Sequence, residues 1–136
     1  MEIVEITDAF DCARLAKGTQ IRKDDGVEGD AFALRKGESY LSMNCLDLLD
    51  GDRSEQLDSL RAVLERKLNV SGTARLAIIN VGGTKRSVLP HSVLNFVHEP
   101  EADDESHCGM YGLEYNNELV QDLIAESVVD VVKARR

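Results

Sequence analysis

Tryptophan is absent from this chain of 136 residues, and phenylalanine and tyrosine occur only three times each. The aromatic residues are scattered and lack the interleaved basic residues that proteins use to stack bases and hold phosphates. Direct binding of nucleic acid is therefore disfavoured. Long hydrophobic runs are also lacking, since no segment approaches the roughly 20 apolar residues that span a bilayer. We expect no membrane partner.

Cysteine is scarce, and its pattern argues against a disulfide framework. Cys12, Cys45 and Cys108 are odd in number and widely spaced, whereas disulfide-stapled domains carry paired cysteines. The N-terminal residues 1–5 are acidic and alternate in polarity, unlike the basic and apolar start of a signal peptide. These features predict a cytoplasmic protein with reduced thiols, in which Cys12 and Cys45 lie on helices as small core residues.

Positive charge is missing from a long C-terminal segment. Residues 87–132 contain no Lys or Arg but ten of the 25 acidic residues, so this segment accounts for the net charge of −9. Such one-sided charge repels nucleic acid and attracts cations or a basic partner. We expect folding to gather these acids on one exposed side. They are Glu99, Glu101, Asp103, Asp104, Glu105, Glu114, Glu118, Asp122, Glu126 and Asp130.

The hydrophobic content of 43% is enough for the core of one domain over residues 1–136. Leucine and valine recur at spacings of three and four over residues 53–68, which predicts an amphipathic helix. Residues 74–81 form a short apolar run that ends at glycines, as is typical of a buried strand. A second long helix is predicted over residues 117–134. The expected fold is mixed α+β, a small sheet packed by two main helices.

Shorter elements are predicted from local patterns. Asp52 and Glu55 form a capping box for the helix that follows them, and Gly82-Gly83 is interpreted as a hairpin turn. Short helices are predicted over residues 8–17 and 43–49. Strands are predicted over residues 2–6, 31–35, 38–41, 85–89 and 93–98.

The best candidate for a functional site is the connection over residues 98–113, between a predicted strand and a predicted helix. It combines two of the three histidines with a serine, a cysteine and five acids. A plainer interpretation stays open, in which it is a solvated acidic loop whose apolar residues pack back on the core. The residues expected to contact a basic partner are Glu99, Glu101, Asp103, Asp104, Glu105, His107 and Tyr111.

An enzymatic alternative takes His98, Ser106 and His107 as the candidate catalytic residues. His107 would be the general acid or base of a small hydrolase or nuclease, because nearby carboxylates favour a protonated imidazole. This alternative predicts that the three side chains converge on one cleft, with an arginine such as Arg22 or Arg35 opposite.

No metal or cofactor is indicated by the motifs. The acidic run 103–105 lacks the alternating ligands and central glycine of a calcium loop. His98, His107 and Cys108 lack the paired spacing of a zinc site. Residues 82–85 lack the spacing of a phosphate-binding loop. We expect a protein without a metal or cofactor.

Several stretches together resemble a set of short bacterial conserved hypothetical proteins of unknown function. They are residues 31–35, 40–44, 77–81 and 103–107, followed by Gly109 and Gly112. The resemblance covers about residues 20–130 and implies a bacterial origin without assigning an activity. It also implies a small residue after the histidine, where this chain has Cys108, which argues against a cysteine nucleophile.

The charge and the 98–113 segment together predict a small acidic protein that works by binding another protein. Complementary fields raise association rates and favour one partner over others. An immunity-type or antitoxin-type inhibitor of a basic nuclease, or a subunit of a defence complex, would use such a surface.

Overall fold

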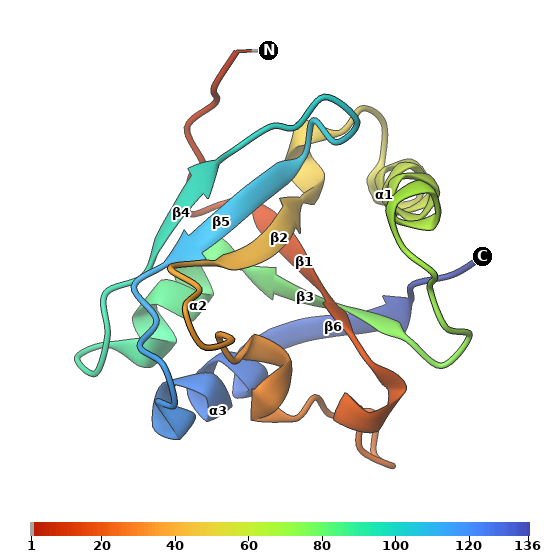
Figure 1. The fold of residues 1–136 in the computed structure, drawn as a ribbon. Helices are drawn as coiled ribbons and strands as arrows, with labels where there is room; N and C mark the ends of the chain where they lie inside the picture. The colour runs from red at the N-terminus through yellow and green to blue at the C-terminus, as the bar shows by residue number, and fades with distance from the viewer. Residues whose placement is uncertain (1) are drawn as a thin grey trace.

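Six antiparallel strands form one sheet in the order β4-β5-β2-β1-β3-β6 (Figure 1). The computed structural model describes residues 2–136. The mixed α+β class is confirmed, and so is the buried strand near residues 74–81, which is β3. The strands are β1 (Asp11–Ala16), β2 (Leu41–Cys45), β3 (Arg75–Asn80), β4 (Asn95–His98), β5 (His107–Tyr111) and β6 (Val128–Lys133).

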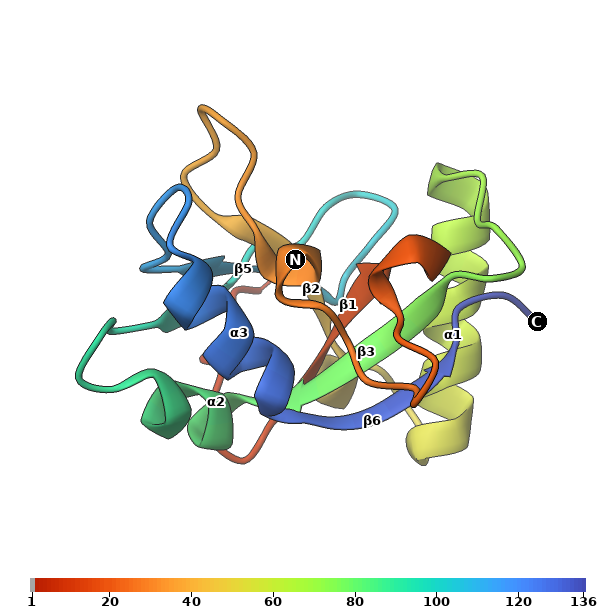
Figure 2. The ribbon, with the colours of Figure 1, turned by 90° about the horizontal axis from the view of Figure 1, so that it is seen from below.

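Helices cover both faces of the sheet (Figures 1 and 2). The helix α1 (Arg53–Lys67) packs on one face, and α2 (Val81–Val88) and α3 (Glu118–Glu126) pack on the other together with the 3-10 helix η2 (Gly29–Phe32). Of these three α-helices the sequence predicted α1 and α3 but not α2, because it assigned the α2 segment to a turn and a strand. None of the helices in residues 2–136 has the length and apolar character needed to cross a bilayer.

The strand β3, which lies between β1 and β6, divides the core into two clusters. Side chains alternate across a strand, so Leu76 and Ile78 pack against α1 while Ala77 and Ile79 face the cluster under α2 and α3. Because both faces of β3 are buried, its sequence is apolar throughout, and this pattern explains why the strand could be predicted.

The helix α1 begins as predicted. The Asp52 carboxylate accepts a hydrogen bond from the backbone N–H of Glu55 at 2.9 Å, and the Glu55 carboxylate accepts one from the backbone N–H of Asp52 at 3.1 Å. This reciprocal capping box satisfies two backbone donors at the helix start. The prediction of a helix over 53–68 is confirmed.

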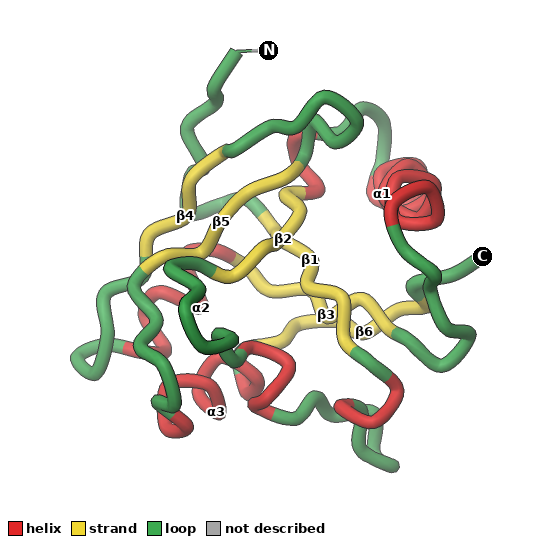
Figure 3. Tube along the Cα trace, viewed as in Figure 1, coloured by secondary structure: helices red, strands yellow, loops and turns green. Residues whose placement is uncertain are grey.

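Two predicted short helices are wrong. The segment 8–17 contains β1, and 43–49 contains most of β2 followed by the 3-10 helix η3 (Leu46–Leu48) (Figure 3). Both strands lie in the middle of the sheet. No residue of β1 is exposed, so its sequence lacks the alternation that separates a strand from a helix. Polar and apolar residues do alternate in β2, but the predicted helix joined the end of this strand to the apolar residues of η3 that follow it. Cys12 and Cys45 are fully buried as expected, but on strands.

The predicted hairpin turn at Gly82-Gly83 is also wrong, because these glycines lie in the first turn of α2. Asn80 caps the helix by accepting a hydrogen bond from the backbone N–H of Gly83 at 2.9 Å. A Cβ atom on Gly82 would lie 2.8 Å from the Cβ of Asp8. Glycine is therefore needed here for close packing, not for a turn.

The remaining corrections concern element boundaries. The predicted C-terminal helix ends at Glu126, and its valine-rich end is β6, which pairs with β3. Residues 2–6 are not a strand, and neither is 31–35, whose first two residues end η2. The segment 85–89 lies mostly in α2, whereas 93–98 contains β4. The long connection 98–113 shrinks to residues 99–106, because His107–Tyr111 forms β5.

Candidate functional site

A groove of about 1010 Å³ opens on the α1 side of the sheet. It arises because β1 and β2 pair only through Cys12 with Cys45 and Ala13 with Asn44. The end of α1 and the connection 99–106, which we call the acidic loop, close the groove on its other sides.

The polar floor of the groove is built by alternation along β2 and β5. Leu41, Met43 and Cys45 point into the core, so Ser42 and Asn44 point to the opposite face. Asn44 pairs with His107, and Ser42 pairs with Gly109. These pairings place Ser42, Asn44 and His107 side by side in the groove, although His107 lies 65 residues from Ser42 in sequence.

Gly109 makes room for an aromatic pair beside this floor. A Cβ atom at this position would lie 2.5 Å from Oε1 of Glu99 and 2.8 Å from Tyr40. Tyr40 and Tyr111 stack across the glycine with ring centroids 5.0 Å apart. The Tyr111 hydroxyl donates a hydrogen bond to the Glu99 carboxylate at 2.6 Å. That hydrogen bond, with burial and the negative charge, raises the pKa of Tyr111 to about 12.

His107 is held between a backbone carbonyl and a serine hydroxyl. Its Nδ1–H donates to the carbonyl oxygen of Glu99 at 2.8 Å, and its Nε2 lies 3.2 Å from the Ser42 hydroxyl. With Nδ1 protonated, Nε2 of the neutral ring is an acceptor, so Ser42 is the donor. His107 is buried, whereas Ser42 is exposed and lines the groove.

Asp104 anchors the acidic loop to the body of the protein. Its carboxylate accepts hydrogen bonds from the Asn44 amide at 2.9 Å, from the Ser106 hydroxyl at 3.0 Å and from Lys67 Nζ at 3.2 Å. Lys67 also donates to Glu101 at 2.7 Å. Partial burial alone lowers the pKa of Lys67, but its bonds to Glu101 and Asp104 raise it overall. The buried carboxylate of Asp104 is thus paired and hydrogen-bonded, as burial of a charge requires.

Three cations line the other side of the groove. Arg14 Nη1 donates to the carbonyl of Ser42 at 2.9 Å, and its Nε donates to the carbonyl of Ala31 at 3.0 Å. Burial lowers the pKa of Arg14, the Glu38 carboxylate opposes that shift, and Arg35 adds to it. Within residues 2–136, neither Arg14, Lys17 nor Arg35 forms an ion pair.

The structure separates the three candidate catalytic residues. His107 lines the groove, but His98 and Ser106 do not. His98 accepts from the backbone N–H of Val4 at 2.9 Å and its Nε2 binds the carbonyl of Glu105 at 2.7 Å, so both ring nitrogens are occupied. Ser106 is fully buried and bound to Asp104.

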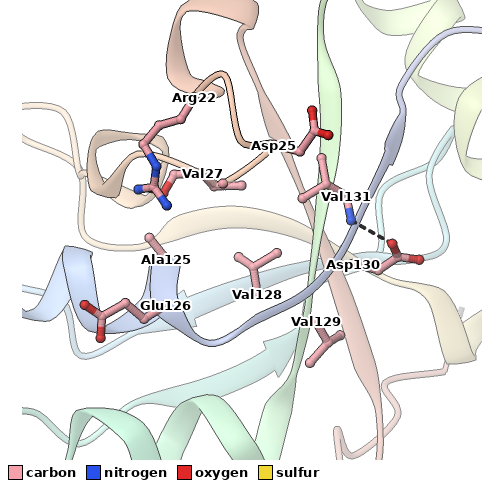
Figure 4. A pocket seen from close by; sticks show the side chains of 10 residues that line it. Arg22, Asp25, Val27, Ala125, Glu126, Val128, Val129, Asp130 and Val131 are labelled. Atoms are coloured by element: carbon pink, nitrogen blue, oxygen red, sulfur yellow. Dashed lines mark hydrogen bonds between the residues drawn. The ribbon is translucent and has the colours of Figure 1, made fainter.

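The two candidate arginines are separated as well. Arg35 lines the groove, whereas Arg22 lies beside a second hollow of about 420 Å³ between residues 22–27 and the α3–β6 junction (Figure 4). Figure 4 shows Arg22 and Glu126 at one end of this hollow and Asp130 at the other. No predicted catalytic residue reaches it.

The residues expected to contact a partner differ in their accessibility. Glu101, Asp103 and Glu105 are exposed. Glu99 and Tyr111 are half-buried, and Asp104 and His107 are buried. The exposed acids can contact a partner directly, and the buried groups hold the loop in place.

The ten acids of residues 87–132 do not form a single surface. The acidic loop and α3, which carries Glu118, Asp122 and Glu126, lie at opposite ends of the molecule in Figure 1. The expectation of one acidic side was wrong because β5 carries the chain away from the acidic loop, along the sheet, to the end of the molecule where α3 lies. Glu101 and Asp104 are the two members of the set with an ion pair among the described residues.

Ser42, Asn44 and Lys67 are among the groove residues that sequence reasoning missed. Residues 40–45 alternate strictly between polar and apolar side chains, which is the signal of a strand with one polar face. The prediction of a helix over residues 43–49 assigned the end of this strand to another element, so the polar face was not predicted. No local pattern indicates a role for Lys67, because its partners Glu101 and Asp104 lie 34 and 37 residues away in sequence.

The three thiols meet in the core, away from the groove. Cys12 Sγ lies 3.8 Å from Cys108 Sγ, and Cys45 is the cross-strand neighbour of Cys12. Hydrogen bonding to Cys108 and Cys45, together with burial, raises the pKa of Cys12, which keeps its thiol protonated. No group of three or more His, Cys, Asp or Glu residues within 2–136 is placed to hold a metal ion.

The fold and groove thus define a mixed α+β protein with a polar, cation-walled groove beside a rigid acidic loop. Comparison of the chain with protein-family models, with curated proteins and with solved structures gave no match. Functional assignment therefore depends on the geometry of these residues.

Proposed function

We propose that this protein is a cytoplasmic binding module that docks a positively charged protein through its acidic loop. The observation that carries the proposal is the state of Asp103 and Glu105. Both are exposed, and neither has an ion pair within residues 2–136. Unneutralised charge of one sign steers the encounter with an oppositely charged partner.

Rigidity of the loop supports the same proposal. Backbone hydrogen bonds connect Glu101 and Asp104 in both directions, at 2.9 and 3.1 Å. His98 and His107 each bind a loop carbonyl, and Asp104 fixes the loop to β2 and α1. A surface that is already ordered loses less conformational entropy on binding. The buried polar residues of the segment therefore serve docking by holding the exposed acids in position.

The class of partner follows from the charge. A basic nuclease inhibited by an immunity-type or antitoxin-type protein, or a basic subunit of a defence complex, would present the complementary surface. The cytoplasmic location is supported by the three cysteines, which are all free and buried. Reduced thiols are typical of intracellular proteins.

The test begins with capture of the partner at low salt from the organism that encodes the chain, followed by its purification. Association rates are then measured for the unaltered protein, for Asp103→Asn/Glu105→Gln, and for the matched control Glu118→Gln/Glu126→Gln on α3. We expect the loop variant to associate about tenfold more slowly at low salt, with the difference vanishing at high salt. Equal slowing by both variants, or a rate independent of salt, would contradict the proposal.

A second candidate function is a small hydrolase, and one contact favours it. His107 Nε2 faces the groove and bonds Ser42, which leaves it available as a general base. His98 and Ser106 do not contribute, because their polar atoms are occupied inside the protein.

A further inference from the structure

Ser42 and His107 have the geometry of a nucleophile and its base. The hydroxyl and Nε2 are 3.2 Å apart. The base is oriented by a third group, the carbonyl oxygen of Glu99, which accepts Nδ1–H at 2.8 Å. This contact keeps the proton on Nδ1 and directs the lone pair of Nε2 at the serine. Serine nucleophiles are generally activated by an oriented base of this kind.

The groove makes Ser42 accessible and favours a ligand of one charge. Ser42 is exposed at the floor of the groove. Arg14 binds the carbonyl of Ser42 itself, and Lys17 and Arg35 line the same groove. The lining also contains the acids Asp30, Glu101 and Asp104, and Lys67 pairs with the last two, so four cations face three carboxylates. The net field near Ser42 therefore favours an anionic ligand.

We propose that Ser42 is an acyl-accepting nucleophile, with His107 as its general base, for esters whose acyl part carries a carboxylate. This inference rests on the second candidate function and gives it a nucleophile and a substrate class. Arg14, which is fixed by its hydrogen bonds to the carbonyls of Ser42 and Ala31, would add positive charge that favours the oxyanion formed on the attacked carbonyl. Arg35 and Lys17 hold the carboxylate of the substrate.

The reaction balances with water as the only co-reactant. Ser42 Oγ forms a bond to the ester carbonyl carbon while its proton passes to His107 Nε2. The tetrahedral intermediate collapses, the ester C–O bond breaks, and the departing alcohol takes the proton from His107. A water molecule then gives its proton to His107 and attacks the acyl-serine. The acid product leaves, and the proton returns to Ser42.

The experiment uses the full chain and two probes. A fluorophosphonate is expected to add once, at Ser42, as located by peptide mass mapping. Hydrolysis of p-nitrophenyl hydrogen succinate is expected to exceed that of p-nitrophenyl acetate. Ser42→Ala should lower succinate hydrolysis by at least about 100-fold, and Arg35→Gln should lower the preference for succinate about fivefold. Ser59→Ala, an exposed serine on α1, is the matched control and should change neither result.

The base is tested with His107→Asn, whose amide can still donate to the Glu99 carbonyl, with circular dichroism as the check on folding. Loss of labelling and hydrolysis in both Ser42→Ala and His107→Asn supports the inference. Loss of hydrolysis in His107→Asn but not in Ser42→Ala overturns Ser42 as the nucleophile, but leaves a hydrolase in which His107 activates water. Labelling spread over several serines overturns Ser42 as the nucleophile, and hydrolysis unchanged in both variants overturns the inference and the hydrolase function together.

Discussion

At the residue scale, the neighbours of a polar side chain decide what it can do. His98 and His107 come from the same predicted segment, yet both nitrogens of His98 are bound within the protein while Nε2 of His107 faces an exposed serine. Tyr111 shows the same dependence. Its hydroxyl donates to the Glu99 carboxylate, so ionisation of the tyrosine would place two negative charges side by side.

Tyr111 therefore gives a prediction of pH dependence. Its pKa is raised to about 12 in the folded state, against about 10 in an unfolded chain. The folded state favours the neutral phenol, so this stabilisation is fully present below pH about 10 and is lost as the pH rises toward about 12. The stability advantage of the unaltered protein over Tyr111→Phe should shrink across that window, as measured by urea unfolding.

Glu99→Gln provides the control for this prediction. Removing the carboxylate should bring the ultraviolet titration of Tyr111 to lower pH, because the main cause of the raised pKa is gone. A Tyr111 titration that is the same in Glu99→Gln and in the unaltered protein would contradict the assignment.

At the element scale, tertiary pairing decides the limits of the strands and the rigidity of the acidic loop. The strand β6 forms at the end of a segment with a helical pattern because β3 offers it an edge to pair with. The acidic loop owes its shape to one buried side chain, since Asp104 connects it to β2 through Asn44 and to α1 through Lys67.

Replacing Asp104 by alanine should destabilise the protein by about 3 kcal/mol, because the Asn44 amide and the Ser106 hydroxyl lose their partner in the interior. The side chain of Asp104 is 1% exposed. Urea unfolding measures the change in free energy. The adjacent Asp103→Ala is the matched control and should stay within about 0.5 kcal/mol of the unaltered protein, since Asp103 is exposed. Similar losses in the two variants would show that Asp104 does not anchor the loop.

At the scale of the whole molecule, the sheet separates the groove from the thiols. Residues on β2 and β5 point alternately to the groove and to the core cluster that holds Cys45 and Cys108, and Cys12 of β1 lies in the same cluster. Ser42 is exposed on the groove side, whereas the three thiols on the other side are fully buried.

The three thiols should accordingly report global unfolding. Each is 0% exposed, so a thiol reagent should modify the native protein slowly and all three cysteines at one common rate, which is set by opening of the core. Addition of denaturant should make all three react at once. The measurement is mass spectrometry at timed intervals. Fast modification of a single cysteine in the native protein would show that one edge of the sheet opens independently.

The sequence by itself determined the elements whose pattern is local. The helix near residues 53–67 is encoded by leucine and valine at spacings of three and four and by its capping box. The strand β3 is encoded by an apolar run that ends at glycines. The fold class followed from these elements, and the missing basic residues in 87–132 identified a charged segment. Such features depend on neighbours a few residues apart, so they can be read without the fold.

Only the tertiary structure decided the site. It converted two predicted helices into strands by pairing them with neighbouring strands inside the sheet, divided the acids between two ends of the molecule, and placed Ser42 against His107. Strand register brings together side chains that are far apart in sequence, and a shift of one residue would turn Ser42 to the opposite face. The chemistry of the groove is therefore a property of strand pairing, which no local pattern specifies.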